Sequence, residues 1–373
     1  MNICKKPLTL IFLIILSSLY TQAQILDKSW RNLVHTMPSE WYATEQAKAI
    51  AENVLLYQRD IGGWPKNVQE HQALTEGQKA ALREEKSDPM GCTTDNGATF
   101  TEMLFLSRMY QQVPDERYKN AFLKGFDYFI EAQYDNGGWP QFYPLKKGYY
   151  SHITYNDDSM ANIMDVLRDL IENNGTYSIQ LDKKRLEQAK KAFDKGIKCI
   201  LKTQYKQKGV LTGWCAQHDE YTLLPAKARA YELPSLSGQE SAEIVLLLMS
   251  VNPPTEEIKK AVVAAVEWFE KTKITGLRIE RYITPQGLKE KRIIEDPNAP
   301  PLWARFMELE DNSPFFCDRD GIKQSSMMDI GQERRNGYGW YSEAPQKVLK
   351  AYPAWKAKWI TDETPSTPKG KKK

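Results

Sequence analysis

The chain has 373 residues and carries 51 basic against 48 acidic side chains, a formal net charge of +3. A charge this close to zero gives no general attraction to nucleic acid or to a membrane surface, and the length suffices for one large domain. The cysteines that follow the N-terminal segment are too scattered to form a dense disulfide framework. They are Cys92, Cys199, Cys215 and Cys317.

The N-terminal residues have the pattern of a secretory signal peptide. Lys5 and Lys6 precede an apolar run over residues 8–16, and a small-residue segment ending at Ala23 resembles a cleavage site. The apolar run is too short to span a bilayer. We therefore expect a signal peptide over residues 1–23 and a mature protein that is secreted or periplasmic, without a membrane anchor.

A tryptophan recurs every 75 residues and marks a repeated unit, at Trp64, Trp139 and Trp214. The first two lie in Gly-Gly-Trp-Pro turns, and the third lies in a weaker Gly-Trp-Cys turn. Each turn follows an apolar helical pattern and precedes a long irregular stretch and a second apolar helix. We assign Trp64 to packing and keep Trp139 and Trp214 as candidates for contact with a sugar ring.

The repeat predicts helices in pairs. The expected first helices cover residues 44–57, 115–133 and 182–204, and the expected second helices cover residues 99–110, 159–171 and 239–249. A degenerate fourth unit starts with a helix over 255–272, and the alternating residues 278–294 predict a β-hairpin. Because three antiparallel helix pairs can close into a ring, we expect a mainly α toroid whose intra-pair loops share one rim.

The loops inside the helix pairs are far longer than a helix connection needs, and long ordered loops usually carry function. They cover residues 62–98, 137–158 and 213–236. Each has a charged cluster before its second helix: Asp95 with Asn96, Asp157 with Asp158, and Arg229. Carboxylate and amide oxygens suit Ca²⁺. Attraction to the helix dipole explains Asp158 by itself, but it does not explain three clusters at equivalent positions.

Two later segments combine arginine with aromatic residues. Arg319 follows Phe315 and Phe316, and Arg335 precedes a Gly-Tyr-Gly-Trp run. Because arginine binds carboxylates through two parallel hydrogen bonds, both residues suit a polyanionic sugar. Taken singly, each segment indicates only a surface turn held by ion pairs.

Together these segments resemble the pectate lyases of polysaccharide lyase family 10. The matching motifs run from about residue 45 to 350. They are the Gly-Gly-Trp-Pro turns, Thr94-Asp95-Asn96-Gly97-Ala98-Thr99, Tyr155-Asn156-Asp157-Asp158, Ala228-Arg229-Ala230-Tyr231-Glu232-Leu233-Pro234-Ser235 and Phe316-Cys317-Asp318-Arg319-Asp320. The resemblance implies an (α/α)₃ toroid with small β and irregular additions. It also implies a single catalytic domain over 24–361, and we expect a disordered Lys-rich tail over 362–373.

The activity that the resemblance implies is Ca²⁺-assisted β-elimination of polygalacturonate to 4,5-unsaturated oligogalacturonides. Arg229 would remove the C5 proton, Asp157 and Asp95 would lie at the Ca²⁺, and Arg319 would bind a uronate carboxylate. Further candidates for substrate binding are Asn96, Asp158, Arg335, Trp139 and Trp214. Since arginine is normally protonated, its use as a base requires a desolvated site near other cations.

Two other functions fit the same residues. A glycoside hydrolase could use Asp95 and Asp157 as its acid and base, and it would release a reducing end without the ultraviolet-absorbing double bond of a lyase product. A non-catalytic carbohydrate-binding protein could use the repeated tryptophans, and it would bind without cleaving. In each case we expect a monomer whose partner is an acidic polysaccharide such as pectate.

Overall fold

The computed structural model describes residues 27–360, so the expected signal peptide and the Lys-rich tail lie outside the described residues. No helix between these limits is long and apolar enough to cross a membrane. The chain forms two compact units. The first holds the described residues up to 133 together with 140–146 and 162–193, and the second holds 134–139, 147–161 and the described residues from 194 onward. The single domain expected over 24–361 stays a prediction.

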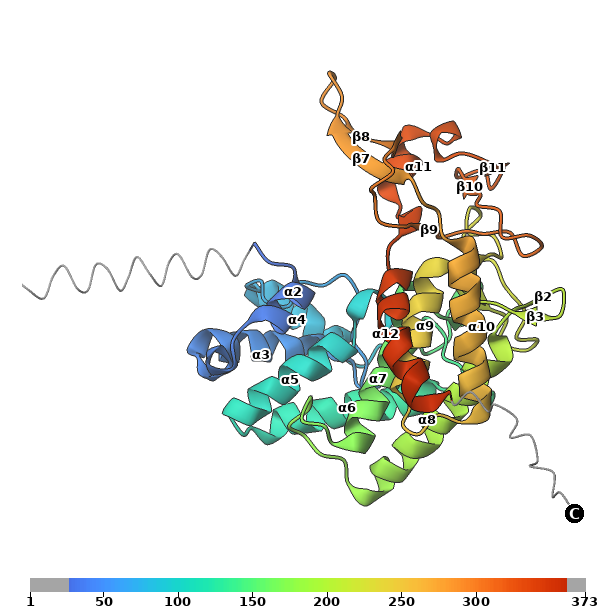
Figure 1. Ribbon diagram of the computed structural model, residues 1–373. Coiled ribbons are helices and arrows are strands. Elements are labelled where there is room, and N and C mark those ends of the chain that lie inside the picture. Colours follow the sequence, from blue (N-terminus) through green and yellow to red (C-terminus); the bar gives the residue numbers. More distant parts are fainter. Residues whose placement is uncertain (1–26, 361–373) are drawn as a thin grey trace, which may run out of the picture. The chain divides into compact units, whose positions relative to one another are not determined.

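Helices make up most of the first unit (Figure 1). They are α2 (Trp30–Thr36), α3 (Glu45–Tyr57), α4 (Glu76–Glu85), α5 (Phe100–Gln112) and α6 (Glu116–Ala132), with the 3₁₀ turns η1 (Ser39–Ala43) and η2 (Asp95–Gly97). Two further helices, α7 (Ser159–Glu172) and α8 (Lys183–Thr203), each begin in one unit and end in the other.

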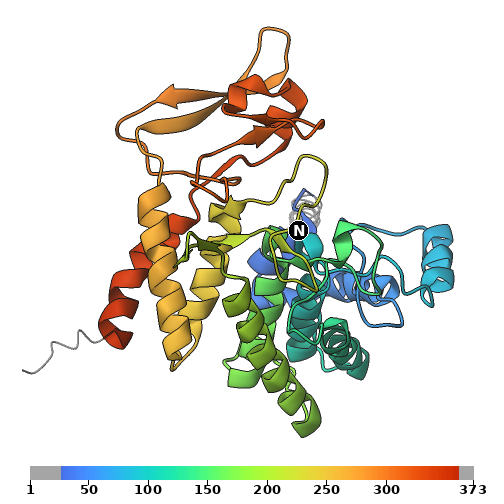
Figure 2. The same cartoon turned by 90° about the vertical axis from the view of Figure 1, so that its right-hand side faces the viewer.

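The second unit combines helices with short antiparallel strand pairs (Figure 2). Its helical segments are η3 (Tyr149–Ser151), η4 (Asn156–Asp158), α9 (Gly238–Ser250), α10 (Glu256–Thr272), η5 (Met327–Asp329), α11 (Gln332–Gly337) and α12 (Pro345–Trp359). The pairs are β1 (Ile153–Thr154) with β5 (Gln217–His218), β2 (Lys206–Gln207) with β3 (Val210–Leu211), β4 (Trp214–Cys215) with β6 (Leu236–Ser237), β7 (Leu277–Ile283) with β8 (Lys289–Glu295), β9 (Trp303–Ala304) with β12 (Tyr341–Ser342), and β10 (Phe316–Cys317) with β11 (Lys323–Gln324).

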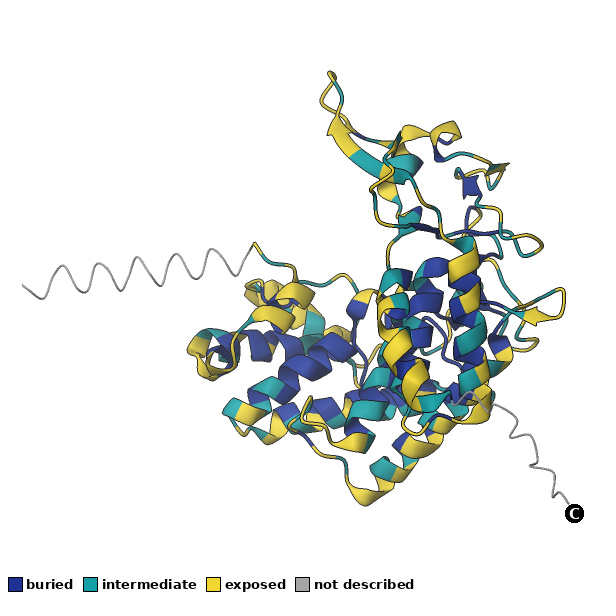
Figure 3. Cartoon of the chain, in the orientation of Figure 1, coloured by how far each residue is buried: buried dark blue, intermediate teal, exposed yellow. Residues whose placement is uncertain are grey.

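The predicted mainly helical class is confirmed, and so are the paired helices and the hairpin. Each predicted helix agrees with α3, α5 to α10 within about two residues, the usual uncertainty of helix ends. Side chains define several starts: Thr44, Asp115 and Thr255 each accept a backbone N–H from the first turn of the helix that follows. The helices carry buried residues toward their neighbours and exposed residues toward solvent (Figure 3). Closure into a toroid stays a prediction.

The Gly-Trp turns are packing devices. The indole Nε1 of Trp64 donates to the carbonyl of Val54 in α3, and that of Trp214 donates to Ile200 in α8, both at 2.8 Å. Trp303 repeats this contact in the degenerate fourth unit, where its Nε1 donates to Phe269 at 2.9 Å. The sequence hides this fourth tryptophan because the β7–β8 hairpin lies between it and its helix.

A glutamine before each turn joins one repeat to the next. The side-chain amides of three equivalent glutamines donate to carbonyls in the following first helix at 2.8–3.0 Å. The pairs are Gln58 with Ala121 of α6, Gln133 with Ala192 of α8, and Gln204 with Ala261 of α10. In the first turn Gly62 has a φ of +105°, and a Cβ there would lie 2.2 Å from the carbonyl oxygen of Lys124. Only glycine allows this approach.

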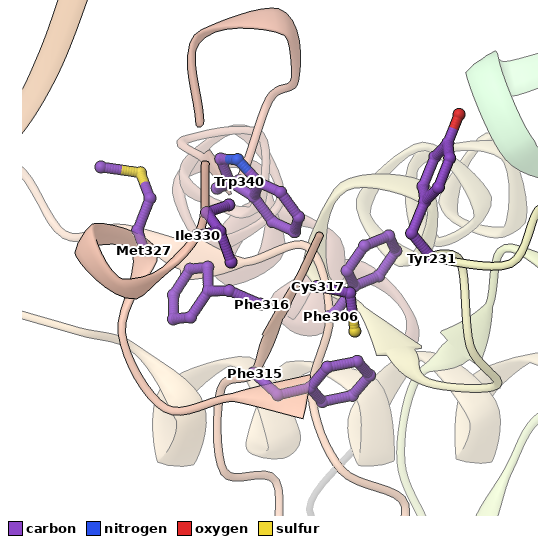
Figure 4. Close-up of a cluster of buried hydrophobic side chains, with 8 residues drawn as sticks. All are labelled: Tyr231, Phe306, Phe315, Phe316, Cys317, Met327, Ile330 and Trp340. Carbon is purple, nitrogen blue, oxygen red and sulfur yellow. The ribbon is translucent and has the colours of Figure 1, made fainter. Parts of the chain in front are cut away.

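An aromatic cluster holds the irregular C-terminal part of the second unit together (Figure 4). Its buried members are Tyr231, Phe306, Phe315, Phe316, Cys317, Met327, Ile330 and Trp340. Tyr231 lies at the edge of the cluster and directs its hydroxyl away from the other labelled side chains. The four cysteines of the described range are free and buried, and burial raises the pKa of each thiol.

Two glutamates are buried together in the first unit. Glu70 and Glu102 are 1% and 2% exposed, and Trp30 Nε1 donates to Glu102 Oε1 at 2.6 Å. Burial raises the pKa of both carboxyls, that of Glu102 to about 7. A carboxyl whose pKa is raised on folding stabilises the fold below its ordinary pKa, and this contribution is lost as the pH rises through the folded-state value.

We predict that Glu102→Gln weakens the pH dependence of stability. The wild-type melting temperature should fall as the pH is raised from ~5 to ~8.5, because the pair must lose protons that it holds while folded. The variant should fall less over the same range. Glu76→Gln, at an exposed pair with Lys79, serves as the control and should behave like the wild type. Identical pH profiles for wild type and Glu102→Gln would contradict this account.

Candidate functional site

Arg305 organises one side of the site in the second unit. Its Nη2 donates to Glu240 Oε1 and to Asn156 Oδ1, both at 2.9 Å, and lies 3.5 Å from Asp157 Oδ1. The Glu240 side chain is fully buried in the first turn of α9. Burial would lower the pKa of Arg305, but the carboxylates of Glu240 and Asp157 outweigh it, and the net pKa lies above the ordinary value. Arg305 is thus a fixed cation.

Asp157 presents an exposed carboxylate from a left-handed turn. Asp157 and Asp158 have φ values of 52° and 60°, a conformation that is uncommon for residues other than glycine. The backbone N–H groups of Tyr155 and Asn156 both donate to Ala216 at 2.9 Å, which fixes the start of η4. Asn156 Nδ2 donates to Asp157 Oδ2 at 2.7 Å. The strained turn therefore directs one carboxylate toward solvent beside Arg305.

Arg229 forms a two-point ion pair with Glu232. Its Nε and Nη2 donate to the two carboxylate oxygens at 2.7 and 2.5 Å. The Arg229 side chain is 46% exposed, whereas that of Glu232 is 8% exposed. The hydrogen bonds from Glu232 raise the pKa of Arg229 above its ordinary value despite partial burial. Arg229 is accessible, but in this arrangement its cation is favoured.

Arg334 was not predicted from the sequence, yet it is the most buried arginine of this region. Its guanidinium carbon lies 3.9 Å from the ring centre of Tyr231 and 4.0 Å from that of Tyr338. Its Nε and Nη2 are buried without a hydrogen-bond partner in the described chain. Burial lowers the pKa of Arg334, and the positive charge of Arg229 adds to this effect. It is the arginine whose surroundings most disfavour a cation.

Of the other predicted arginines, Arg319 lies near this cluster and Arg335 does not contribute a free charge. The guanidinium carbon of Arg319 is 5.5 Å from the Tyr231 ring, and its exposed side chain pairs with Glu333. Arg335 is partly buried, pairs with both carboxylate oxygens of Glu290 and donates to two backbone carbonyls. The guanidinium N–H groups of Arg335 therefore hold the fold together, in place of the predicted contact with substrate.

Trp139 and Trp214 also have packing roles in place of the predicted contact with substrate. Their exposed fractions are 1% and 0%, so neither ring offers a face to a ligand. Sugar contact was predicted because each tryptophan begins a long loop. The loops are present, but both side chains point into the protein interior.

Asp95 and Asn96 belong to the first unit. Asp95 is 2% exposed, pairs with Lys66, and accepts a hydrogen bond from Gln141 Nε2 at 2.7 Å. Its Oδ1 is buried without a hydrogen-bond partner in the described chain. Asn96 is exposed and donates to Asn67 at 3.0 Å. The role of Asp95 in binding a metal stays a prediction.

A separate group of possible metal ligands was not predicted. Among residues 27–360, His152, Asp219 and Glu220 place one ligand atom each within 4.8 Å of one another. Hydrogen bonds within the chain already use these groups: His152 Nδ1 lies 2.9 Å from Glu220 Oε2, and Asp219 accepts backbone N–H groups from its own turn. We therefore assign the group to structure.

In the second unit, two of the predicted site residues, Asp157 and Arg229, lie at the ends of one row. Tyr338 links the two halves, because its hydroxyl donates to Glu232 at 3.1 Å and its ring lies 4.7 Å from the guanidinium carbon of Arg305. The row therefore runs from Asp157 through Arg305, Tyr338 and Glu232 to Arg229. It places one exposed carboxylate and several fixed cations together, an arrangement suited to an anionic ligand and to a developing negative charge.

Comparisons with known proteins identify the family of the chain. The model of the pectic acid lyase family matches residues 58–349. The family 10 polysaccharide lyase from Cellvibrio cellulosa is 35% identical, with a TM-score of 0.71, over 85% of this chain and 97% of that one. A variant of that lyase with one Asp replaced by Ala, in complex with trigalacturonic acid, gives the same identity and TM-score over 87% and 95%. No match was found among curated proteins.

We predict that Arg335→Gln lowers the free energy of unfolding by about 1–3 kcal/mol, because partly buried hydrogen bonds to a charged group are lost. The Arg335 pair holds the pKa of Glu290 at about 2, so the carboxylate is charged and would lose its main partner. Denaturant melting measures the loss. The matched control is Arg319→Gln, whose pair is exposed and should leave the melting curve unchanged. Equal destabilisation by both variants would contradict the structural role of Arg335.

Proposed function

Because the chain belongs to the pectic acid lyase family and is a pectate lyase, we propose that it cleaves polygalacturonate by β-elimination at the row from Asp157 to Arg229. The observation that carries this proposal is the chain of contacts that links the exposed carboxylate of Asp157 through Arg305, Tyr338 and Glu232 to Arg229. The products would be 4,5-unsaturated oligogalacturonides.

The reaction requires negative charge to be held on the substrate. The C5 proton of galacturonate lies next to a carboxylate and is weakly acidic, so the carbanion left by its removal needs cations at the carboxylate oxygens. Arg305 is suited to this task because Glu240 and Asn156 fix its position before substrate arrives. Arg319 is exposed and could pair with a neighbouring uronate by exchanging its partner Glu333.

Ca²⁺ is the cation that suits Asp157. The Asp157 carboxylate is 43% exposed and offers hard oxygen atoms, but Asn156 Oδ1 already accepts from Arg305. Ca²⁺ takes six to eight oxygen ligands, far more than this turn supplies. We therefore propose that Asp157 holds Ca²⁺ jointly with substrate carboxylates and water. When bound, the ion would add positive charge at the substrate carboxylate.

Arg229 is the proposed base, and its ion pair with Glu232 must loosen before it can accept a proton. The ion pair raises the pKa of Arg229, so proton transfer requires that the pair loosen when substrate binds. Two features favour the proposal: Arg229 is exposed, and the guanidinium of Arg334 lies close enough to disfavour a second cation. High pH should favour the reaction, because it lowers the cost of a neutral guanidinium.

Secretion, a cleaved signal peptide over 1–23 and action as a monomer complete the proposal. A polymeric substrate outside the cell requires an exported enzyme, and the N-terminal pattern of the sequence supplies the signal.

The function and the metal are tested together. The protein without residues 1–23 is incubated with polygalacturonate in Ca²⁺ or in excess chelator, and ultraviolet absorbance follows the product double bond. We expect absorbance to rise only with Ca²⁺, and we expect the chelator to leave the melting temperature nearly unchanged, since the ion is held mainly through substrate. Reducing ends without absorbance would indicate a hydrolase. A large loss of thermal stability in chelator would indicate a structural ion instead.

We predict that Arg229→Ala lowers turnover by ~10²–10⁴-fold, as expected for loss of a general base. The variant should retain much of the affinity for oligogalacturonate. Arg229→Lys should not restore turnover, because it keeps a charge and loses the fork geometry. Arg117→Ala, at an exposed ion pair of α6, is the control and should keep full turnover. A folded Arg229→Ala protein with near-normal turnover would exclude Arg229 as the base.

A further inference from the structure

The β7–β8 hairpin places two cations directly opposite each other. The antiparallel register pairs Arg281 of β7 with Lys291 of β8. Like charges at directly opposed positions destabilise a strand pair. Within residues 27–360 no carboxylate forms an ion pair with either side chain. Lys291 Nζ instead donates to the backbone carbonyl of Tyr338 at 2.9 Å.

The next position of the same hairpin shows the opposite pattern. Glu280 faces Arg292 in the register, and their side chains form an ion pair at 2.6 Å. Arg278 also has carboxylate partners, Glu280 at 3.5 Å and Asp296 at 3.3 Å. The hairpin thus neutralises Arg278 and Arg292. It leaves the opposed Arg281–Lys291 pair without a carboxylate partner. A ligand with negative charge would stabilise the Arg281–Lys291 pair in the way that Glu280 stabilises Arg292.

A cavity lies beside this pair. Its volume is about 600 Å³, and its lining includes Arg278, Arg281, Lys291, Ile279, Trp340 and Tyr341. The lining has one carboxylate, that of Glu343. In both ribbon views the hairpin extends away from α9, α10 and α12 of the same unit (Figures 1 and 2). The cavity therefore combines excess positive charge with apolar and aromatic surface, in a size range typical of ligand sites.

We propose that this cavity is a second binding site for the polyuronate chain, outside the row from Asp157 to Arg229. Carboxylates of the polymer pair with Arg281 and Lys291, and the apolar face of a sugar ring packs against Ile279 and Tyr341. The site retains the polymer between cleavage events and raises the local concentration of substrate. This inference rests on the proposed function, because it takes the same polymer as ligand.

Lys291 connects the cavity to the catalytic row, so it is unsuitable as the test residue. Its Nζ holds the Tyr338 backbone, and the Tyr338 hydroxyl donates to Glu232. Arg281 has no such contact, and its side chain is exposed in the hairpin. Substitution of Arg281 should therefore leave both the fold and the catalytic row intact.

The test compares Arg281→Gln and Arg281→Glu with Arg292→Gln, a matched control in the same hairpin. We expect Arg281→Gln to raise the KM for polygalacturonate about two- to fivefold, the change typical of one exposed ion pair. Arg281→Glu should raise it further, since attraction becomes repulsion. Both variants should keep the wild-type kcat, and both should cleave trigalacturonate normally, because Arg281 makes no contact with the row from Asp157 to Arg229.

Retention on a polygalacturonate gel gives a readout that does not need catalysis. The mobility of each protein is divided by its mobility in a gel without polymer, which corrects for the changed net charge of Arg281→Glu. On this relative scale Arg281→Glu should be retained less than the wild type by polygalacturonate and equally by fully methyl-esterified pectin. Unchanged retention and unchanged polymer KM for Arg281→Glu would overturn the proposal. Loss of trigalacturonate cleavage would also overturn it, because Arg281 would then belong to the catalytic site. If the wild type does not cleave the polymer, the proposed function fails, and the gel still decides whether the cavity binds polyuronate.

Discussion

The hydrogen bond from a glutamine side chain to a carbonyl of the next repeat sets the geometry on which the functional loops depend. Gln58 and Gln204 are each 5% exposed, and their amides donate to α6 and α10. A buried amide without a partner would cost about 1–3 kcal/mol, so the turn after each glutamine is held against the following helix. The backbone of Gly62 also packs closely against α6, at the carbonyl of Lys124. The long loops therefore each begin from a turn that two helices fix.

In the second unit the arginines are held by different means, and this difference decides what each can do. Glu240 fixes Arg305, and Glu232 fixes Arg229, so both remain cations in this arrangement. Arg334 is held by aromatic rings, and burial lowers its pKa. Cations fixed in advance stabilise a developing negative charge without reorganisation. The same fixation is the obstacle to a neutral Arg229, which makes Glu232 the residue that controls the base.

The site residues that could be read from the sequence are those in continuous motifs. Asp157 and Arg229 were found because each lies in a charged cluster before a second helix. Arg305 was missed because its partners Asn156 and Glu240 are 149 and 65 residues away, and no local pattern marks it. The same limit applies to Arg335, which the sequence presents as a free cation and which Glu290 neutralises 45 residues away.

The sequence by itself determined the helices, the Gly-Trp turns and the β7–β8 hairpin, because each depends on local periodicity or on one residue type that a backbone position requires. It also determined the family, since the motifs that carry the resemblance are continuous in the chain. Only the tertiary structure decided which charges are neutralised and which rings are buried. Ion pairs and burial depend on side chains far apart in the chain, so Arg229 and Arg334 have pKa shifts of opposite direction that no sequence pattern distinguishes.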